Sequence, residues 1–260
     1  MGEEAKKLFA NAQAMLDKII KNKWLEARGI VGFYPANTVD HDDIEVYSPG
    51  PEKGKVLCKF HSLRQQVERD QDHFVALADF IAPKETGVTD YIGLFAVSAG
   101  FRQEEICAQF EKDHDDYSII MLKTLADRLA EAFSEQLHVE VRKSLWGYSP
   151  EENLSHADIL NVKYQGIRPA PGYPSQPDHT EKRTMWDLMR VKEETGIELT
   201  ESLAMNPASS VSGLYFANPH AYYFAVEEIC KDQVEDYARR KGISTPEVEK
   251  WLSTILSYER

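Results

Sequence analysis

The residues best suited to chemistry lie in one short run, Asp178-His179-Thr180-Glu181. An imidazole beside two carboxylates is a common ligand set for zinc and other divalent metals. Neighbouring side chains at the start of a helix diverge, however, and no second histidine lies close by in the sequence. The run is more typical of a helix N-terminus, where acidic groups and threonine face free backbone N–H groups. A metal-dependent hydrolase built on Asp178, His179 and Glu181 stays as an alternative, which stoichiometric metal in the purified protein would support.

This run closes a proline-rich stretch, residues 166–182. Its seventeen residues hold four prolines and two glycines, which exclude a helix or a central strand because proline fixes φ and lacks an N–H. The stretch also carries Arg168, Tyr173 and His179, whereas disordered linkers are poor in aromatic residues and rich in like charges. We therefore predict an ordered polar loop suited to ligand contacts, with a structural crossover as the alternative.

A second candidate group lies on the longest predicted helix, between Asp116 and Trp146. Its apolar stripe consists of Leu122, Leu125, Leu129, Phe133, Leu137, Val141 and Leu145. An adjacent polar stripe consists of Asp127, Glu131, Glu135 and His138. Carboxylates in a row repel one another unless they are solvated or face a cation. The polar stripe is therefore either a solvated helix face or, through Glu131 at the border of the apolar stripe, a surface facing a positively charged ligand.

The elements that must position these groups cluster rather than alternate strictly. Helices are also predicted over residues 3–24, 180–194, 232–241 and 245–256, with Asp232 and Glu235 as a capping box. Strands are predicted over residues 29–34, 43–47, 56–60, 91–97, 197–203, 211–216 and 222–226. Residues 35–37 and 218–220 are expected to form turns. This order favours an α+β fold with an antiparallel or mixed sheet.

Composition narrows the class of protein. The 260 residues are enough for one large or two small domains, and the net charge of −13 argues against a nucleic-acid or anionic-membrane surface. With no long apolar segment and no signal peptide, the chain is expected to be soluble and cytoplasmic. Cys58, Cys107 and Cys230 are expected to be reduced thiols. The absence of G-x-G-x-x-G and P-loop motifs argues against a Rossmann domain, including a Rossmann methyltransferase.

Six segments carry longer and more specific signatures. They are Ala78-Asp-Phe-Ile-Ala-Pro83, Asp90-Tyr-Ile-Gly-Leu-Phe-Ala-Val97, Ala126-Asp-Arg-Leu-Ala-Glu-Ala132, Arg168-Pro-Ala-Pro-Gly-Tyr173, Pro177-Asp-His-Thr-Glu-Lys182 and Tyr223-Phe-Ala-Val226. In order and along the whole chain, they resemble the C-terminal activation domain of cobalamin-dependent methionine synthase. The resemblance assigns residues 1–260 to that domain and implies its α+β fold, with a twisted antiparallel sheet and long helices.

The resemblance also implies a function. Domains of this family bind S-adenosylmethionine and present its methyl group to cobalamin held on a neighbouring module. Cofactor oxidised to Co(II) is thereby reduced and remethylated, which sustains methionine biosynthesis from homocysteine and methyltetrahydrofolate. The electron comes from a flavodoxin-like or diflavin reductase. The resemblance implies that the domain positions the reactants and supplies no catalytic nucleophile of its own. The isolated chain is therefore not expected to catalyse a reaction alone.

Particular residues match the family's ligand contacts. They are Arg168, Tyr223, Phe224, Glu131, Tyr173 and His179. Arg168 matches an arginine that contacts the ligand, and its guanidinium suits the carboxylate of S-adenosylmethionine. Glu131 matches a helix acid near the charged end of the ligand. The two late aromatic residues match an aromatic-plus-backbone contact. Tyr173 and His179 match loop residues that approach the cobalamin or the ligand.

One departure from the family pattern opens an alternative. The family's domain normally begins further upstream, with an element whose acidic residue also contacts the ligand, and this chain is expected to lack that element. It would then serve only as a non-catalytic docking module for the cobalamin module and a flavoprotein reductase. An acidic surface suits a partner with a basic patch.

Overall fold

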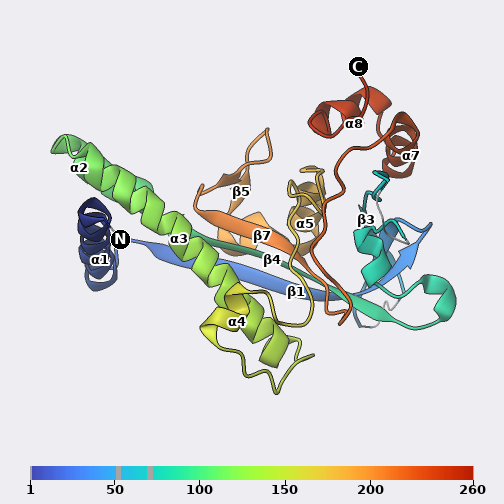
Figure 1. Ribbon diagram of the computed structural model, residues 1–260, viewed down its shortest axis with the longest axis horizontal. Helices are drawn as coiled ribbons and strands as arrows, with labels where there is room; N and C mark the ends of the chain where they lie inside the picture. Colours follow the sequence, from blue (N-terminus) through green and yellow to red (C-terminus); the bar gives the residue numbers. More distant parts are fainter. Residues whose placement is uncertain (1, 51–53, 69–72, 260) are drawn as a thin grey trace. The chain divides into compact units, whose positions relative to one another are not determined.

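The computed structural model describes residues 2–50, 54–68 and 73–259 (Figure 1). Its α-helices are α1 Glu3–Asn22, α2 Gln103–Lys112, α3 Asp116–Glu140, α4 His156–Leu160, α5 Glu181–Met189, α6 Val191–Thr195, α7 Lys231–Lys241 and α8 Thr245–Trp251. Its strands are β1 Glu26–Val39, β2 Asp43–Tyr47, β3 Val56–His61, β4 Asp90–Phe101, β5 Glu198–Leu199, β6 Met205–Asn206 and β7 Ser210–Tyr215. Two 3-10 turns, η1 Leu77–Phe80 and η2 Lys84–Thr86, and a π-helical turn, η3 Val141–Leu145, complete the set. The predicted α+β class is confirmed.

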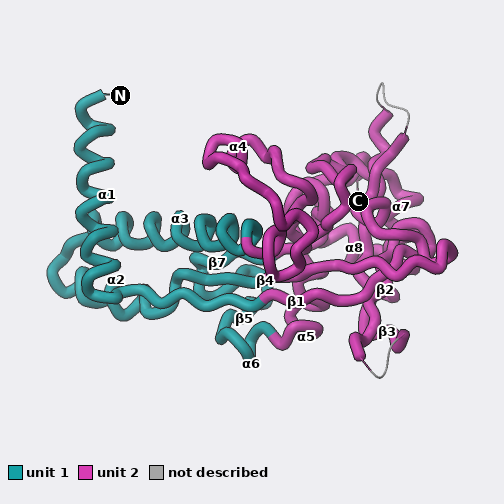
Figure 2. Tube along the Cα trace, turned by 90° about the horizontal axis from the view of Figure 1, so that it is seen from below, with its two compact units in different colours: residues 1–30, 96–139, 191–212 teal, residues 31–95, 140–190, 213–260 magenta. Residues whose placement is uncertain are grey.

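Backbone contacts divide the chain into two compact units (Figure 2). Unit 1 consists of residues 1–30, 96–139 and 191–212, and unit 2 of residues 31–95, 140–190 and 213–260. The boundaries fall within β1, β4 and β7, at the last residue of α3, and between α5 and α6. No described helix combines the length and the apolar character that crossing a bilayer demands.

A five-stranded sheet has the order β3-β2-β1-β4-β7. β1 and β2 pair antiparallel, with Ala36 opposite Val46, and β2 and β3 continue the antiparallel pattern. β4 is buried from Ile92 to Gly100, in agreement with the predicted central strand. The predicted turn at 35–37 is wrong, because β1 runs on to Val39. Pro35 lies just before the residues that pair with β2, so its missing N–H falls outside that ladder.

Unit 1 has a helical core built by α1, α2 and α3. Its buried side chains are Met15, Ile19, Ile106, Cys107, Met121 and Leu122. α1 presents one apolar stripe to this core and ends at Asn22, after which Lys23 adopts a left-handed conformation. Burying each large apolar side chain contributes roughly 1.5–3 kcal/mol, which holds the three helices together. No prediction covered α2.

The buried side of α3 differs from the predicted apolar stripe. The side chains at 122, 126, 130, 134 and 138 are buried, whereas Leu125, Leu129, Phe133 and Leu137 are half-buried. Three of the buried residues, Ala126, Ala130 and Ser134, are small, so the helix can pack closely there. His138, predicted on a polar stripe, is fully buried, which corrects that assignment.

Unit 2 has a second core at its C-terminal end. It consists of Leu63, Val226, Ile229, Val234, Tyr237, Ala238, Val248 and Leu252. α7 begins after Cys230, so the predicted capping box at Asp232 is wrong. α8 begins as predicted, with the Ser244 hydroxyl accepting a hydrogen bond from the Glu247 N–H at 3.3 Å. It ends at Trp251, five residues before the predicted end.

Candidate functional site

The proline-rich stretch 166–182 forms a folded loop in unit 2. Its first part lies against the end of β7, where Ile167 and Phe216 exchange two backbone hydrogen bonds of 3.0 Å and the Leu214 N–H donates to the Pro169 carbonyl at 2.8 Å. Its middle closes on itself, because the Gly172 N–H donates to the Gln176 carbonyl at 2.7 Å. The predicted ordered loop is therefore present, and its backbone is held by hydrogen bonds that proline can still accept.

A second segment, residues 222–226, lies along this loop. It is not a strand, which corrects the prediction, because its backbone groups bond to the loop instead of to a sheet. The Val226 N–H donates to the Pro174 carbonyl at 2.9 Å, and the Phe224 N–H donates to the Ser175 hydroxyl at 3.3 Å. Pro174 has no N–H to give to a ladder, and the Ser175 hydroxyl donates to the Phe224 carbonyl beside it.

Five predicted site residues belong to this assembly: Arg168, Tyr173 and His179 on the loop, and Tyr223 and Phe224 on the segment. The Arg168 N–H donates to the Tyr223 hydroxyl at 2.9 Å, which joins the start of the loop to the segment. Tyr173 is 63% exposed and Tyr223 is 43% exposed, so both rings are accessible.

Phe224 belongs to an aromatic cluster centred on Phe80. The ring centroid of Phe80 lies 5.8 Å from that of Tyr222, 6.2 Å from that of Phe224 and 6.3 Å from that of Phe216, all in tilted or edge-on geometry. Edge-to-face pairs add stability beyond the area that they bury. The cluster therefore gives the 222–226 segment a rigid base.

The sixth predicted site residue, Glu131, lies on α3 in unit 1. Its side chain is exposed, and its carbonyl accepts a hydrogen bond from the Ser134 hydroxyl at 2.8 Å. Contact of Glu131 with a ligand stays a prediction.

The far end of the loop is held by a buried polar cluster. The Lys241 ammonium group of α7 donates to Asp178 Oδ2 at 2.7 Å and to Glu181 Oε1. The Tyr237 hydroxyl donates to Asp178 Oδ2 at 2.8 Å, and the His61 N–H donates to Glu181 Oε2 at 3.2 Å. Asp178 also accepts hydrogen bonds from the Thr180 N–H and hydroxyl, each at 2.7 Å. The Thr180 hydroxyl therefore bonds to the Asp178 carboxylate and does not cap α5, as its position at the start of that helix had suggested.

The pKa values of the two carboxyl groups in this cluster are shifted in opposite directions. Burial opposes ionisation of Asp178, but Lys241 and the Thr180 hydrogen bonds outweigh it and hold its pKa below the ordinary value. Burial dominates at Glu181 and raises its pKa despite Lys241. Burial alone would lower the pKa of Lys241, but Glu181 and Asp178 raise it. Lys241 is therefore a cation held by two acids of unequal strength.

The same contacts account for the acidic run without a metal. Asp178 and Glu181 are both engaged by Lys241, and the described residues contain no group of three or more His, Cys, Asp or Glu side chains placed to hold an ion. The metal-dependent hydrolase has no geometric support within the described ranges.

Comparisons with known proteins identify the family of the chain and support its fold. Residues 1–242 match the family model of the vitamin B12 dependent methionine synthase activation domain. The chain belongs to that family. It is also similar to a solved structure described as the MetH reactivation domain bound to AdoHcy, with 54% sequence identity and a TM-score of 0.94. That match covers 98% of this chain and 78% of the other. The resemblance noted in the sequence and the fold that it implied are confirmed.

The activation domain depends on residues that sequence reasoning missed. Ser175, Tyr237 and Lys241 all support the loop, and the latter two lie about sixty residues from the carboxylates that they contact. The one local signal was Gly172, which precedes Tyr173. It has a φ of +94°, and a Cβ atom there would collide with the His179 ring, so only glycine fits.

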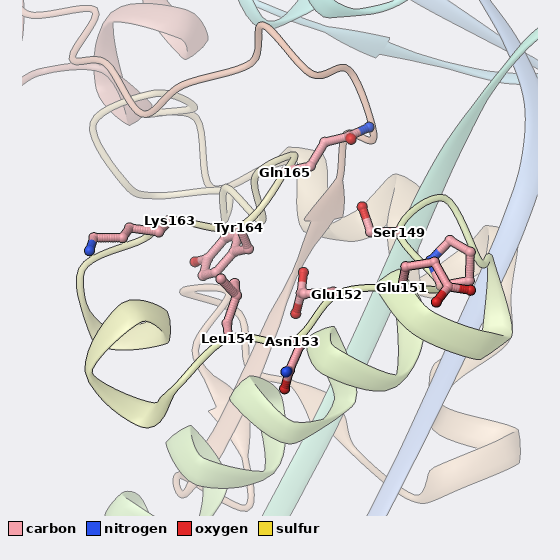
Figure 3. A pocket seen from close by; sticks show the side chains of 9 residues that line it. Ser149, Glu151, Glu152, Asn153, Leu154, Lys163, Tyr164 and Gln165 are labelled. Atoms are coloured by element: carbon pink, nitrogen blue, oxygen red, sulfur yellow. The ribbon is translucent and has the colours of Figure 1, made fainter.

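A separate pocket of about 350 Å³ lies beside the activation domain's loop, within unit 2 (Figure 3). It is lined by residues 149–154 and 163–165. Glu152 points into it, but its carboxylate is already bound by the buried Arg142 at 2.7 and 2.8 Å. Lys163 points away and pairs with Asp158 at 2.8 Å. Glu152 and Lys163 in the pocket lining are thus already engaged in ion pairs within the protein. The pocket is therefore a weaker candidate for a ligand site than the loop.

His179 gives the domain a pH-dependent contribution to stability. Burial and then Lys182 lower its pKa, and its Nδ1 lies 3.3 Å from the Lys182 ammonium group, as suits a neutral ring that accepts. Because the folded state disfavours protonation, this contribution is present above the unfolded pKa of about 6.5 and is lost as pH falls through the folded value.

We expect His179→Gln to flatten the rise of unfolding free energy with pH over the window just below pH 6.5. Urea titrations at several pH values would measure the slope. His220→Gln, at an exposed position of the same unit, is the control and should leave the slope unchanged. An unaltered slope in His179→Gln would contradict the assignment.

Proposed function

We propose that this activation domain binds S-adenosylmethionine on the surface formed by the loop 166–182 and the segment 222–226. In this way it supports the reductive remethylation of cobalamin by methionine synthase. The observation that carries the proposal is the Arg168–Tyr223 hydrogen bond, which joins a cationic residue and an exposed aromatic ring on one rigid support. The similar reactivation domain bound to AdoHcy, the demethylated product, supports the choice of ligand.

The residue types suit the parts of this ligand. The Arg168 guanidinium can pair with its carboxylate, and the Tyr223 and Tyr173 rings offer faces to the adenine or the sulfonium cation. Backbone groups of the segment are held in place by Ser175, so they can contact the ligand without rearranging. The residues bind and orient, since the sulfonium group is itself the electrophile.

Cobalamin, held on a neighbouring module, would supply the attacking cobalt. The exposed Tyr173, at the turn of the loop, is the residue that we assign to the cobalamin side, and the His179 ring packs against its neighbour Gly172. The electron donor is assigned to a flavodoxin-like or diflavin reductase. The isolated chain is expected to bind ligand without turnover, because the other reactants lie on other modules.

We assign all 260 residues to one activation domain. The family match ends at residue 242, but Val248 and Leu252 of α8 pack in the same core as Val234 and Tyr237 of α7. The last helix is therefore part of the same folded unit as the end of the matched region.

Calorimetric titration of the purified chain with S-adenosylmethionine and with S-adenosylhomocysteine tests the proposal. Saturable binding of one equivalent is expected for each. Absence of binding for both would overturn it and favour the docking-module alternative, in which the chain contacts only the cobalamin module and a reductase.

Arg168→Ala should weaken binding of both ligands by about 10- to 150-fold, the loss expected for a hydrogen-bonded charged contact worth about 1.5–3 kcal/mol. Because Arg168 holds the 222–226 segment through its backbone N–H, the fold should persist. Arg239→Ala, at an exposed position on α7 that pairs with the neighbouring Asp236, is the matched control. Unchanged affinity in Arg168→Ala would remove this residue from the site.

A further inference from the structure

We infer that Lys241 is a positioning residue for the ligand loop: by holding Asp178 and Glu181 it fixes His179 against Gly172 and the turn that carries Tyr173. The inference rests on the proposed function and names a residue outside the set that the family resemblance implied. Lys241 lies on α7, far along the chain from the loop, and would touch neither ligand nor cobalamin.

Lys241 connects the two ends of the turn at which the loop becomes α5. Its ammonium group donates to Asp178 Oδ2 at 2.7 Å, to Glu181 Oε1 and to the Tyr237 hydroxyl at 3.3 Å. Asp178 and Glu181 are almost fully buried, and the Lys241 side chain is 13% exposed. One cation therefore restrains two buried carboxylates that flank His179.

His179 transmits this restraint to the loop. Its ring occupies the space that a side chain at Gly172 would need, with Nδ1 facing Lys182 at 3.3 Å. Gly172 in turn donates to the Gln176 carbonyl at 2.7 Å, and Gln176 donates to the Tyr173 carbonyl at 2.9 Å. Gln176 is also anchored, since its side-chain amide donates to the His61 carbonyl at 2.9 Å. The position of Tyr173 thus depends on contacts that lead back to Lys241.

α7 is a firm base that does not itself need Lys241. Val234, Tyr237 and Ala238 bury it in the C-terminal core, and the neighbouring Arg240 pairs with the buried Asp43. His61 Nδ1 lies 2.9 Å from the same Asp43 carboxylate, which ties β2 and β3 to the helix end. Removing the Lys241 charge should therefore loosen the loop before it loosens the helix.

The test uses Lys241→Met/Glu181→Gln, which removes one positive and one negative charge together and leaves Asp178 bonded to Tyr237 and Thr180. Lys231→Met is the matched control, because Lys231 lies on the same helix and is 66% exposed. Hydrogen exchange of residues 171–177 without ligand and the affinity for S-adenosylhomocysteine are the two readouts. Exchange of α3 amides in unit 1 reports general destabilisation.

Exchange in 171–177 should become about tenfold faster and the affinity about tenfold weaker, with α3 unchanged. Wild-type exchange and affinity in the double variant would overturn the inference, as would equal acceleration in α3. If the double variant does not fold, Lys241→Gln/Glu181→Gln places an amide donor at position 241, and the same readouts decide. If the unaltered chain does not bind S-adenosylhomocysteine, only the proposed function is refuted. Hydrogen exchange of residues 171–177 would still test whether Lys241 restrains the loop.

Discussion

Arg142→Met is expected to lower the free energy of unfolding by about 3–5 kcal/mol, the cost of leaving a buried partner charge uncompensated. Arg142 is fully buried at the π-helical turn that follows α3, and it forms a two-pronged ion pair with Glu152, which is 7% exposed. Its guanidinium also lies 4.2 Å from the centroid of the Tyr164 ring. It therefore ties both segments that line the pocket of Figure 3 to the end of the helix.

Denaturant unfolding of Arg142→Met beside Arg142→Met/Glu152→Gln separates the charge from the packing. The double variant should recover a large part of the loss, because it leaves no carboxylate buried without a partner. Arg239→Met is the control; its partner is partly exposed, so a change below about 1 kcal/mol is expected. A single variant as stable as the control would show that the ion pair contributes little.

Gly166→Ala is expected to destabilise the protein by about 2–4 kcal/mol, combining the left-handed backbone penalty with overpacking. Gly166 has a φ of +81°, and a Cβ atom there would collide with the Phe216 carbonyl and lie 3.0 Å from the Tyr148 hydroxyl. The carbonyl is backbone at the end of β7, so it cannot turn aside as a side chain would. The bridge between Ile167 and Phe216, and with it the start of the ligand loop, must move.

Gly87→Ala isolates the backbone term of this effect. Gly87 lies in the same unit with a φ of +70°, and nothing lies within 4 Å of its missing Cβ, so about 1–2 kcal/mol is expected. Ligand affinity should fall in Gly166→Ala and not in Gly87→Ala, because Arg168 follows the displaced bridge. Equal stability losses in the two variants would mean that the Phe216 contact is tolerated.

Local patterns in the sequence were sufficient for much of this domain. α1, most of α3, β4 and the proline-rich loop follow from side-chain periodicity and from the backbone limits of proline and glycine, which act within a few residues. The motifs that matched the activation-domain family are equally local, so the family and five of the residues assembled around the loop could be named before any contact was known.

Only the tertiary structure decided how those residues are held. The strand predicted at 222–226 became a loop partner because Ser175 and Pro174 take up its backbone groups, and His138 became a core residue because of the side on which α3 packs. Lys241 carries no local signal at all, since its role arises from two carboxylates some sixty residues away. Periodicity records what a residue's neighbours along the chain require, whereas burial and charge pairing depend on which distant segments the fold brings together.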